Sequence, residues 1–378
     1  MSEPKEITFQ PKLLWDIGTA YDFFVSLKVL HEPTTFGLRA AWAAGMRSRL
    51  PAEARETLEQ LHQLKFCILP FHWVHRVSAP KDSQAVLKAL ADLAPEDRLP
   101  EFGKDPEMPL EVAAVLSEVE ANEAWDDEQV GDILEAFKDK PEDESLKRES
   151  VELMLEWWAR RGEFGERLLS ALRAYQEVFF AEEENRIRPA LQRALEQAQQ
   201  RASQVSVLDL LEELSQGVRL EEGFETPELV LAPSYWGTPL LIYGRATKDR
   251  TIILFGARPR EASLVPGEVV PDALLRILKA LSDPTRLRIL RYISEEPLTP
   301  SQLSSRLRLR SSTVVHHLDL LRLATLVQFS IAGHGVERRY SARPEVIATI
   351  FPNVEAFLGQ GESIEPPPIQ AEAQSARD

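Results

Sequence analysis

The stretch of this chain that decides its fold lies near the carboxyl end and contains three short segments in a fixed order. They read Asp283-Pro284-Thr285-Arg286-Leu287-Arg288-Ile289-Leu290, then Thr299-Pro300-Ser301-Gln302-Leu303, then Ser311-Ser312-Thr313-Val314-Val315-His316-His317-Leu318. Each of the first two begins with a residue type that caps helices, followed by a proline, which suits the first helical position. In the second, Thr299 and Gln302 also have the spacing of a capping box. The pattern therefore predicts three short helices joined by tight turns.

The third helix, expected over residues 311–323, has two different faces. On a helical wheel, Val314, Leu318 and Leu321 form an apolar stripe. The side chains on the opposite side and its flanks are Ser312, Val315, His316, Asp319 and Arg322. The stripe must be buried against the two preceding helices, so the other face is free to meet a partner.

Two β-type runs follow, over residues 326–331 and 336–341. The second run carries the adjacent Arg338 and Arg339, and Arg343 lies just beyond it. A helix-turn-helix followed by a basic two-stranded wing is the geometry of proteins that read the major groove of double-stranded DNA. Arginines on such a wing suit contacts with phosphates or the minor groove.

We expect Ser312, Val315 and His316 to face the base edges. A hydroxyl can donate or accept, an imidazole can contact the acceptors of a purine, and a valine can meet the methyl group of thymine. His317 lies nearer the apolar stripe and is expected to pack. The candidate DNA-binding residues are Arg310, Ser311, Ser312, Thr313, Val315, His316, Arg322, Arg338 and Arg339.

The charge distribution supports this hypothesis although the net charge of −16 argues against it. Residues 271–345 contain 12 Lys+Arg and 7 Asp+Glu, a balance of +5, whereas the residues before and after them carry −17 and −4. A basic module inside an acidic chain is typical of a nucleic-acid-binding domain. The acidic remainder should be repelled by phosphate and stay away from the duplex.

The preceding residues 1–265 indicate an α-rich domain that ends in a small sheet. Helical spacing is clear over residues 21–30, 53–64, 83–93 and 110–137. Three β-branched runs within residues 228–256, separated by turns, predict a three-stranded antiparallel meander. A Pro-Gly segment then marks the boundary to a winged helix over residues 271–358, and residues 359–378 are Pro-rich and polar, so we expect a disordered tail. The chain is thus expected to be mainly α with small β.

Several classes of protein are not expected. No apolar run is long enough for a transmembrane helix, and no amino-terminal signal peptide is visible. The single cysteine, Cys67, fits a reducing cytoplasm. Cys67, His72 and His75 are zinc-ligand types, but their apolar neighbours favour packing, so we expect neither a metal nor a cofactor. No phosphate-binding loop, nucleophile elbow or zinc-protease motif occurs, so we expect no enzyme.

Residues 278–340 resemble the winged-helix domain of the ArsR family of bacterial transcriptional regulators. The residues that carry the resemblance are Ala280-Leu281-Ser282-Asp283-Pro284-Thr285-Arg286-Leu287-Arg288-Ile289-Leu290, Ser312-Thr313-Val314 with His316-His317-Leu318, and Arg339-Tyr340 at the end of the wing. The resemblance implies a homodimer that binds a two-fold DNA site. Such a homodimer often acts as a repressor. A further helix expected over residues 346–358 would be available to pack against the second copy.

The chain departs from the family pattern at three places. The helix over residues 300–307 lacks the clustered cysteines of the family's metal sensors, so metal sensing there is not expected. Arg310 stands where many members place a capping serine, so Ser311 or Ser312 is expected to cap instead. Val315 stands where a hydroxyl residue is common, which indicates a different sequence preference.

The role of residues 1–265 stays open between dimerisation and the sensing of an unknown small-molecule effector. An alternative for the whole chain also stays open. In it the protein is a ligand- or protein-binding module whose winged helix makes protein contacts only.

Overall fold

The computed structural model describes residues 11–64, 69–103, 108–138, 146–220, 226–267, 270–331 and 338–359. The first elements are β1 (Lys12–Trp15), α1 (Thr19–His31), α2 (Ala40–Ser48), α3 (Ala52–Gln63), α4 (Phe71–Arg76), α5 (Ser83–Ala91), α6 (Pro95–Gly103), α7 (Leu110–Asn122), α8 (Asp127–Ala136), α9 (Arg148–Ala159), α10 (Arg161–Tyr175) and the π-helical turn η1 (Gln176–Phe180). They continue with α11 (Ala181–Ala202), α12 (Val207–Ser215), β2 (Val218–Leu220), β3 (Glu228–Ser234), β4 (Ile242–Thr247) and β5 (Arg250–Gly256). The chain is mainly α with small β, as predicted.

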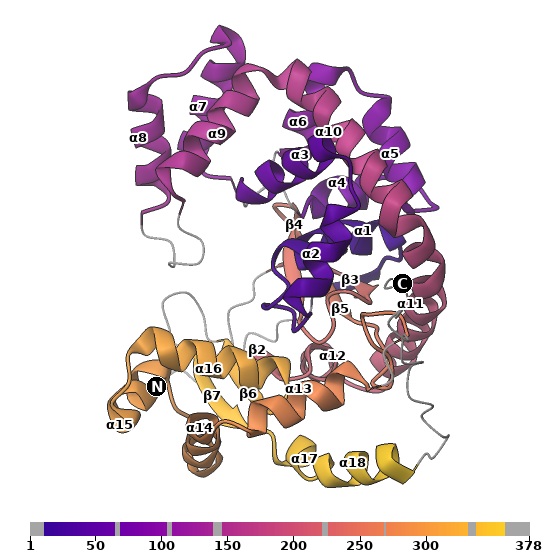
Figure 1. Cartoon of the computed structure of the whole chain (residues 1–378), viewed down its shortest axis with the longest axis vertical. Helices are drawn as coiled ribbons and strands as arrows, with labels where there is room; N and C mark the ends of the chain where they lie inside the picture. The colour runs from indigo at the N-terminus through magenta and orange to yellow at the C-terminus, as the bar shows by residue number, and fades with distance from the viewer. Residues whose placement is uncertain are drawn as a thin grey trace, which may run out of the picture.

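The carboxyl-terminal elements form a separate group. They are α13 (Asp272–Leu281), α14 (Pro284–Glu295), α15 (Pro300–Leu307), α16 (Ser311–Leu323), β6 (Val327–Ile331), β7 (Arg339–Ala342), α17 (Pro344–Ile347) and α18 (Ile350–Gly359). Figure 1 shows this group at one end of the molecule and α5 to α10 at the other, with the long helix α11 along one side between them. Of the expected disordered tail, all but Gly359 lies outside the described residues.

The predicted antiparallel meander over residues 228–256 is wrong in its strand pairing. The sheet has four strands in the order β1-β3-β5-β4, and β3 pairs in parallel with both β1 and β5. In this sheet the hairpin from β4 to β5 is the antiparallel pair that the structure describes. After β3 the chain first forms the outer strand β4 and then returns through the Lys248-Asp249 turn, so β5 fills the place beside β3.

Both faces of this sheet are covered, which explains why β3 and β5 are continuously apolar. Leu229 and Leu231 of β3 face a small core with α11 and α12. Val230 and Ala232, which alternate with them, face the large core of the helical part. Continuous apolar runs are typical of parallel strands buried on both sides.

The large core is built mainly by the helices α1 to α11 and holds the fully buried Trp157, Trp158 and Trp236.

The helical spacing over residues 110–137 belongs to two helices, α7 and α8. The chain turns at Glu123, whose φ is +51°, before Asp126 caps α8. None of the described helices is long and apolar enough to span a membrane.

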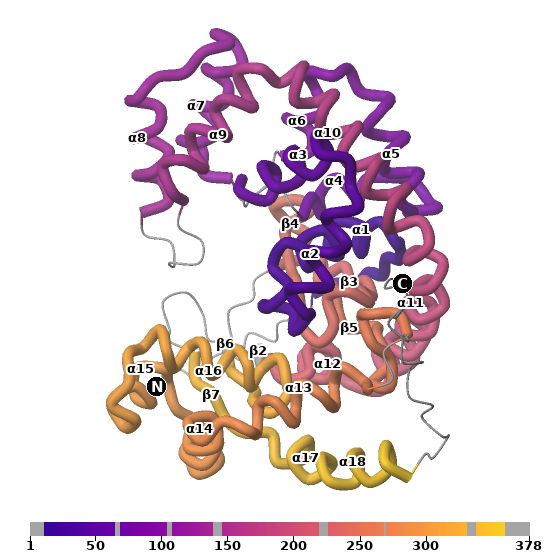
Figure 2. Tube along the Cα trace, in the orientation of Figure 1, coloured from indigo at the N-terminus to yellow at the C-terminus, as the bar shows by residue number. Residues whose placement is uncertain are grey.

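The carboxyl-terminal group has its own core, and its sheet has a strand that the sequence did not predict. β6 and β7 are antiparallel, as a wing requires, but β2 pairs in parallel with the other edge of β6. Figure 2 shows β2 beside β6 in the Cα trace. Val218 of β2 packs against the core of the carboxyl-terminal group. The segment after α12 is therefore part of the winged sheet.

Gly217 allows this close approach of β2 to the wing. Its carbonyl accepts a hydrogen bond from the amide of Phe329 at 3.0 Å. Its φ is +126°, and a Cβ on it would lie 3.0 Å from the carbonyl oxygen of Val327. A larger residue would be strained in this backbone conformation and crowded against β6.

Candidate nucleic-acid interface

Two capped helices form the frame on which α16 rests. The Asp283 carboxylate accepts a hydrogen bond from the amide of Arg286 at 2.9 Å, and this bond holds the pKa of Asp283 below its usual value. At the start of α15 the Thr299 hydroxyl accepts from the amide of Gln302 at 3.2 Å, and the Gln302 side chain accepts from the amide of Thr299 at 2.9 Å. Both predicted caps are present, so the two helices begin where the sequence places them.

Helix α16 buries the predicted apolar stripe. Val314, Leu318 and Leu321 are each 0% exposed, and they share a core with residues of α14 and α15. The side chains at its start and on the opposite face are exposed, namely Arg310, Ser311, Ser312, Thr313, Val315 and His316. The helix thus presents to solvent a surface that combines hydroxyl, imidazole and apolar groups.

The expected serine cap of α16 is wrong. The N-cap residue is Arg310, and within the described structure no side-chain hydrogen bond caps this helix. The amides of Thr313 and Val314 are satisfied by the Arg310 carbonyl, at 3.1 and 3.2 Å. Backbone bonds of the first turn replace the side-chain cap, so the hydroxyls of Ser311 and Ser312 do not cap this helix.

His317 lies at the edge of the buried stripe, as expected. Its side chain is half-buried, and its Nδ1 atom is buried without a hydrogen-bond partner among the residues that the structure describes. Burial lowers the pKa of His317, and the nearby charge of Arg286 acts in the same direction. His317 therefore packs toward the start of α14, whereas His316 faces solvent.

The wing gathers cationic side chains around one aromatic ring. The Cζ atoms of Arg338 and Arg322 lie 5.4 and 5.7 Å from the centroid of the Phe329 ring. Arg338 and Arg339 are exposed, whereas Arg322 is half-buried and its Nε atom has no hydrogen-bond partner in the part of the chain that the structure describes. The connection over residues 332–337 lies outside the described residues.

The expected phosphate contact of Arg343 is not supported by its position. Its side chain is 17% exposed and pairs with Glu345, and its Nη1 atom donates to the carbonyls of Gln216 at 2.5 Å and Thr325 at 3.3 Å. Arg343 therefore holds the segment before β2 against the end of α16. No signal in the sequence indicates this role, because Gln216 lies far away from Arg343 along the chain.

Exposed arginines lie just before and at the start of α16 and on strand β7 of the wing. Arg308, at the turn before the helix, and Arg310 and Arg339 are exposed, and no ion pair is seen for them among the described residues. Arg306 differs, because it pairs with Glu296 at 2.6 Å. The alternating arginines in this turn were the sequence signal that could have placed Arg308 among the candidates.

The zinc-ligand residue types of the amino-terminal part do not form a cluster in the described structure. Cys67 lies outside the described residues. His72 contacts the carbonyl of Glu101, and His75 contacts Asp16. Within the described ranges, no group of three or more His, Cys, Asp or Glu side chains has a metal-binding arrangement.

Comparisons with known proteins match the carboxyl-terminal part of the chain. Residues 281–328 match a family model described as a helix-turn-helix domain. Over 69 residues the chain is 41% identical to the HTH-type transcriptional regulator CmtR of Mycobacterium bovis and to CmtR of Mycobacterium tuberculosis, which covers 18% of this chain. The chain spans 58% of the length of these relatives.

A solved structure, the ArsR-like transcriptional regulator from Rhodococcus sp. RHA1, is 28% identical, and the match covers 23% of this chain and 78% of that chain with a TM-score of 0.21. Taken with the capped helices and the wing, the sequence matches show that residues 281–328 form a helix-turn-helix domain similar to those of HTH-type transcriptional regulators.

Proposed function

We propose that this protein regulates transcription by inserting α16 into the major groove of double-stranded DNA. In this proposal Ser312, Val315 and His316 read base edges, and Arg310 and Arg339 bind phosphates on either side. The observation that carries the proposal is the exposed face of α16, which is polar, uncapped by its own serines and bordered by arginines. The sequence similarity to HTH-type transcriptional regulators supports it independently.

We also propose that the protein acts as a homodimer. Large apolar side chains are exposed on α18, where Phe351 is 76% and Leu358 72% exposed, and Leu278 on α13 is 43% exposed. Burying them against a second copy would remove apolar area from water. A two-fold dimer would place its two α16 helices roughly 34 Å apart, one helical turn of DNA. When bound to a promoter, such a dimer would act as a repressor by excluding other proteins from that DNA.

The competing proposal is a ligand- or protein-binding module that uses the winged helix for protein contacts. The acidic remainder of the chain is the feature that favours it, because that charge repels phosphate. The two proposals differ in how the protein should bind duplex DNA. The first requires binding that weakens steeply with salt, and the second requires no specific binding to any duplex.

The experiment begins with selection of duplexes from a random library by the purified full chain. The affinities of His316→Ala and Arg339→Ala are then compared on the selected duplex and on a scrambled one. We expect His316→Ala to lose about 1–3 kcal/mol on the selected duplex alone, because it removes a base contact. We expect Arg339→Ala to weaken both duplexes alike, because phosphates carry no sequence information.

Lys248→Ala is the matched control, because Lys248 is an exposed cation in the β4–β5 turn of the other sheet. It should leave both affinities unchanged. Equal losses of His316→Ala on both duplexes would defeat the base-reading assignment. Failure to enrich any duplex would favour the protein-binding alternative.

A further inference from the structure

The buried Arg258 and the half-buried Arg276 lie where the amino-terminal part meets the winged helix. Arg258 follows β5 and has a side chain that is 2% exposed. Its Nη2 atom donates to the Thr238 carbonyl at 2.8 Å, but among the described residues its Nη1 atom has no hydrogen-bond partner. Arg276, on α13, has two such buried atoms, Nε and Nη1. A buried donor without a partner costs free energy, so these N–H groups need an explanation.

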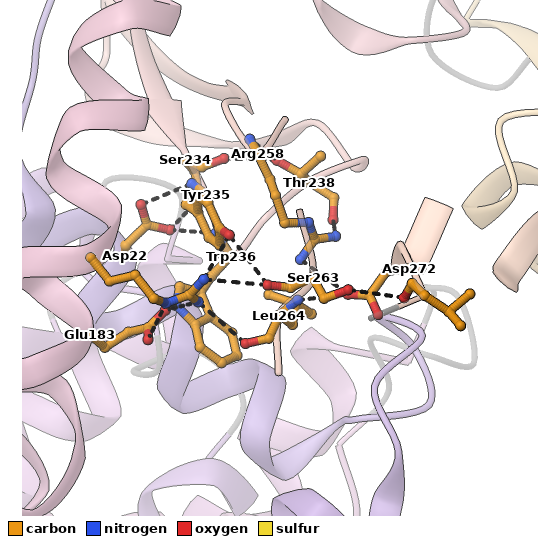
Figure 3. A network of polar contacts seen from close by, with 12 residues as sticks. Asp22, Glu183, Ser234, Tyr235, Trp236, Thr238, Arg258, Ser263, Leu264 and Asp272 are labelled. Carbon is orange, nitrogen blue, oxygen red and sulfur yellow. Dashed lines mark hydrogen bonds and ion pairs between the residues drawn. The ribbon is translucent and has the colours of Figure 1, made fainter. Parts of the chain in front are cut away.

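Asp272 forms a long ion pair with Arg258, but it accepts no hydrogen bond from the unpartnered atoms of either guanidinium group. Its Oδ2 atom lies 3.9 Å from Arg258 Nη1, beyond hydrogen-bond distance, and already accepts a hydrogen bond from the Leu264 amide at 2.7 Å. Figure 3 shows Arg258 and Asp272 together with the hydrogen bond between Asp272 and the Leu264 amide. Burial, and then the neighbouring charge of Arg276, lowers the pKa of Arg258 to about 9.

The adjacent carboxylate Glu183 is engaged elsewhere. It forms an ion pair with Arg186 and accepts a hydrogen bond from the Trp236 indole at 2.9 Å. Arg186 also donates to the Tyr235 hydroxyl at 2.8 Å. Arg258 lies on the same Tyr235 ring, with its Cζ atom 5.7 Å from the ring centroid. Within the described ranges, Asp272 therefore sets one negative charge against the two positive charges of Arg258 and Arg276.

Arg276 connects the winged helix to the amino-terminal part directly. A Cβ on Gly37, in the connection between α1 and α2, would lie 2.8 Å from its Cδ atom and 3.5 Å from its Nη1 atom. Gly37 has a φ of +73°. The Arg276 side chain therefore lies directly against the backbone of this connection. On the other side, its helix enters the winged-helix core through Ile277 and Ala280.

We propose that Arg258 and Arg276 bind an oxyanion, the carboxylate or phosphate group of a small effector, between the amino-terminal part and α13. Guanidinium groups are suited to both anions because their N–H groups match two oxygens at once. The anion would accept hydrogen bonds from the unpartnered atoms and neutralise the excess charge. Because α13 belongs to the winged-helix core, binding of the anion would be transmitted through this core to α16. That regulatory consequence rests on the proposed function, whereas the anion site does not.

The test is calorimetric titration of the full chain with inorganic phosphate and, separately, with acetate, in a buffer free of other oxyanions. We expect saturable binding of at least one anion, and the preferred one identifies the head group. Arg276→Gln should weaken it at least tenfold. Lys279→Gln, which changes an exposed cation on the same helix, should leave it unchanged.

Arg276→Lys is the second variant, in case Arg276→Gln does not fold. It keeps the charge but loses the planar fork, so we again expect weaker binding than in the unsubstituted protein. Absence of saturable binding of both anions to the unsubstituted protein would overturn the site, as would equal binding by the folded Arg276 variants. Anion binding by a protein that retains no duplex would support the site and contradict the proposed function alone.

Discussion

Removing the Arg343 guanidinium should loosen β2 from the winged sheet. The side chain is 17% exposed and donates to the carbonyls of Gln216 at 2.5 Å and Thr325 at 3.3 Å. A hydrogen bond to a charged group contributes about 1.5–3 kcal/mol. Because the second contact is long, we expect Arg343→Ala to lower the free energy of opening of this strand pair by about 2 kcal/mol.

Hydrogen exchange at the amide of Phe329 reports this opening, because that amide donates to the Gly217 carbonyl at 3.0 Å. A loss of about 2 kcal/mol corresponds to exchange that is about 30-fold faster. Glu345→Gln is the control, since it removes an ion pair whose carboxylate is 62% exposed. It should accelerate exchange by about fivefold at most, corresponding to about 1 kcal/mol or less. Unchanged exchange in Arg343→Ala, or equal acceleration in both variants, would refute the reasoning.

Two further predictions concern stability. Leu318→Ala removes a side chain that is 0% exposed in the winged-helix core, so urea unfolding should show a loss of about 2–5 kcal/mol. For His62, burial and then the neighbouring His31 lower the pKa to about 4. In the unfolded chain His62 takes up a proton below its ordinary pKa of about 6.5. Its contribution to the free energy of unfolding is therefore fully present above that pH and is lost as the pH drops toward 4. Urea unfolding at pH 7 and pH 4 should show a loss of up to about 3 kcal/mol from this group, and His62→Gln should remove most of it. An equal pH dependence in His62→Gln, or a neutral Leu318→Ala, would contradict these assignments.

The local features of the winged helix could be predicted because its helix starts and its apolar stripe are encoded by neighbouring residues. Asp283 and Thr299 cap the helices that the sequence assigned to them, and Val314 and Leu318 are buried. Capping and periodicity depend on residues three or four positions apart. Such signals are visible in a single sequence.

The strand order of the amino-terminal sheet could not be predicted in the same way. β3 and β5 are buried on both faces, so their apolar runs carry no alternation that distinguishes a parallel from an antiparallel partner. β1 joins this sheet from a position far away along the chain. The position of β2 was hidden for a related reason, because a three-residue strand is too short to show a period.

Arg343 shows why not every side-chain role at the site could be predicted from the sequence. It follows two arginines of the wing in sequence, so it was assigned to phosphate with them. In the structure its side chain turns toward the carbonyl of Gln216, a partner that tertiary structure alone supplies. Arg310 was placed correctly at the start of α16, but the absence of a serine cap there follows from backbone bonds that the sequence does not show.

The salt dependence of duplex affinity tests the central proposal most directly. If Arg310 and Arg339 of both protomers bind phosphates, four contacts release counterions, and the slope of log K against log salt should be about −3.6 or steeper. The double variant Arg310→Gln, Arg339→Gln should reduce that slope by about the same amount. A flat dependence in the unsubstituted protein, or an unchanged slope in the double variant, would contradict α16 as a reader of DNA.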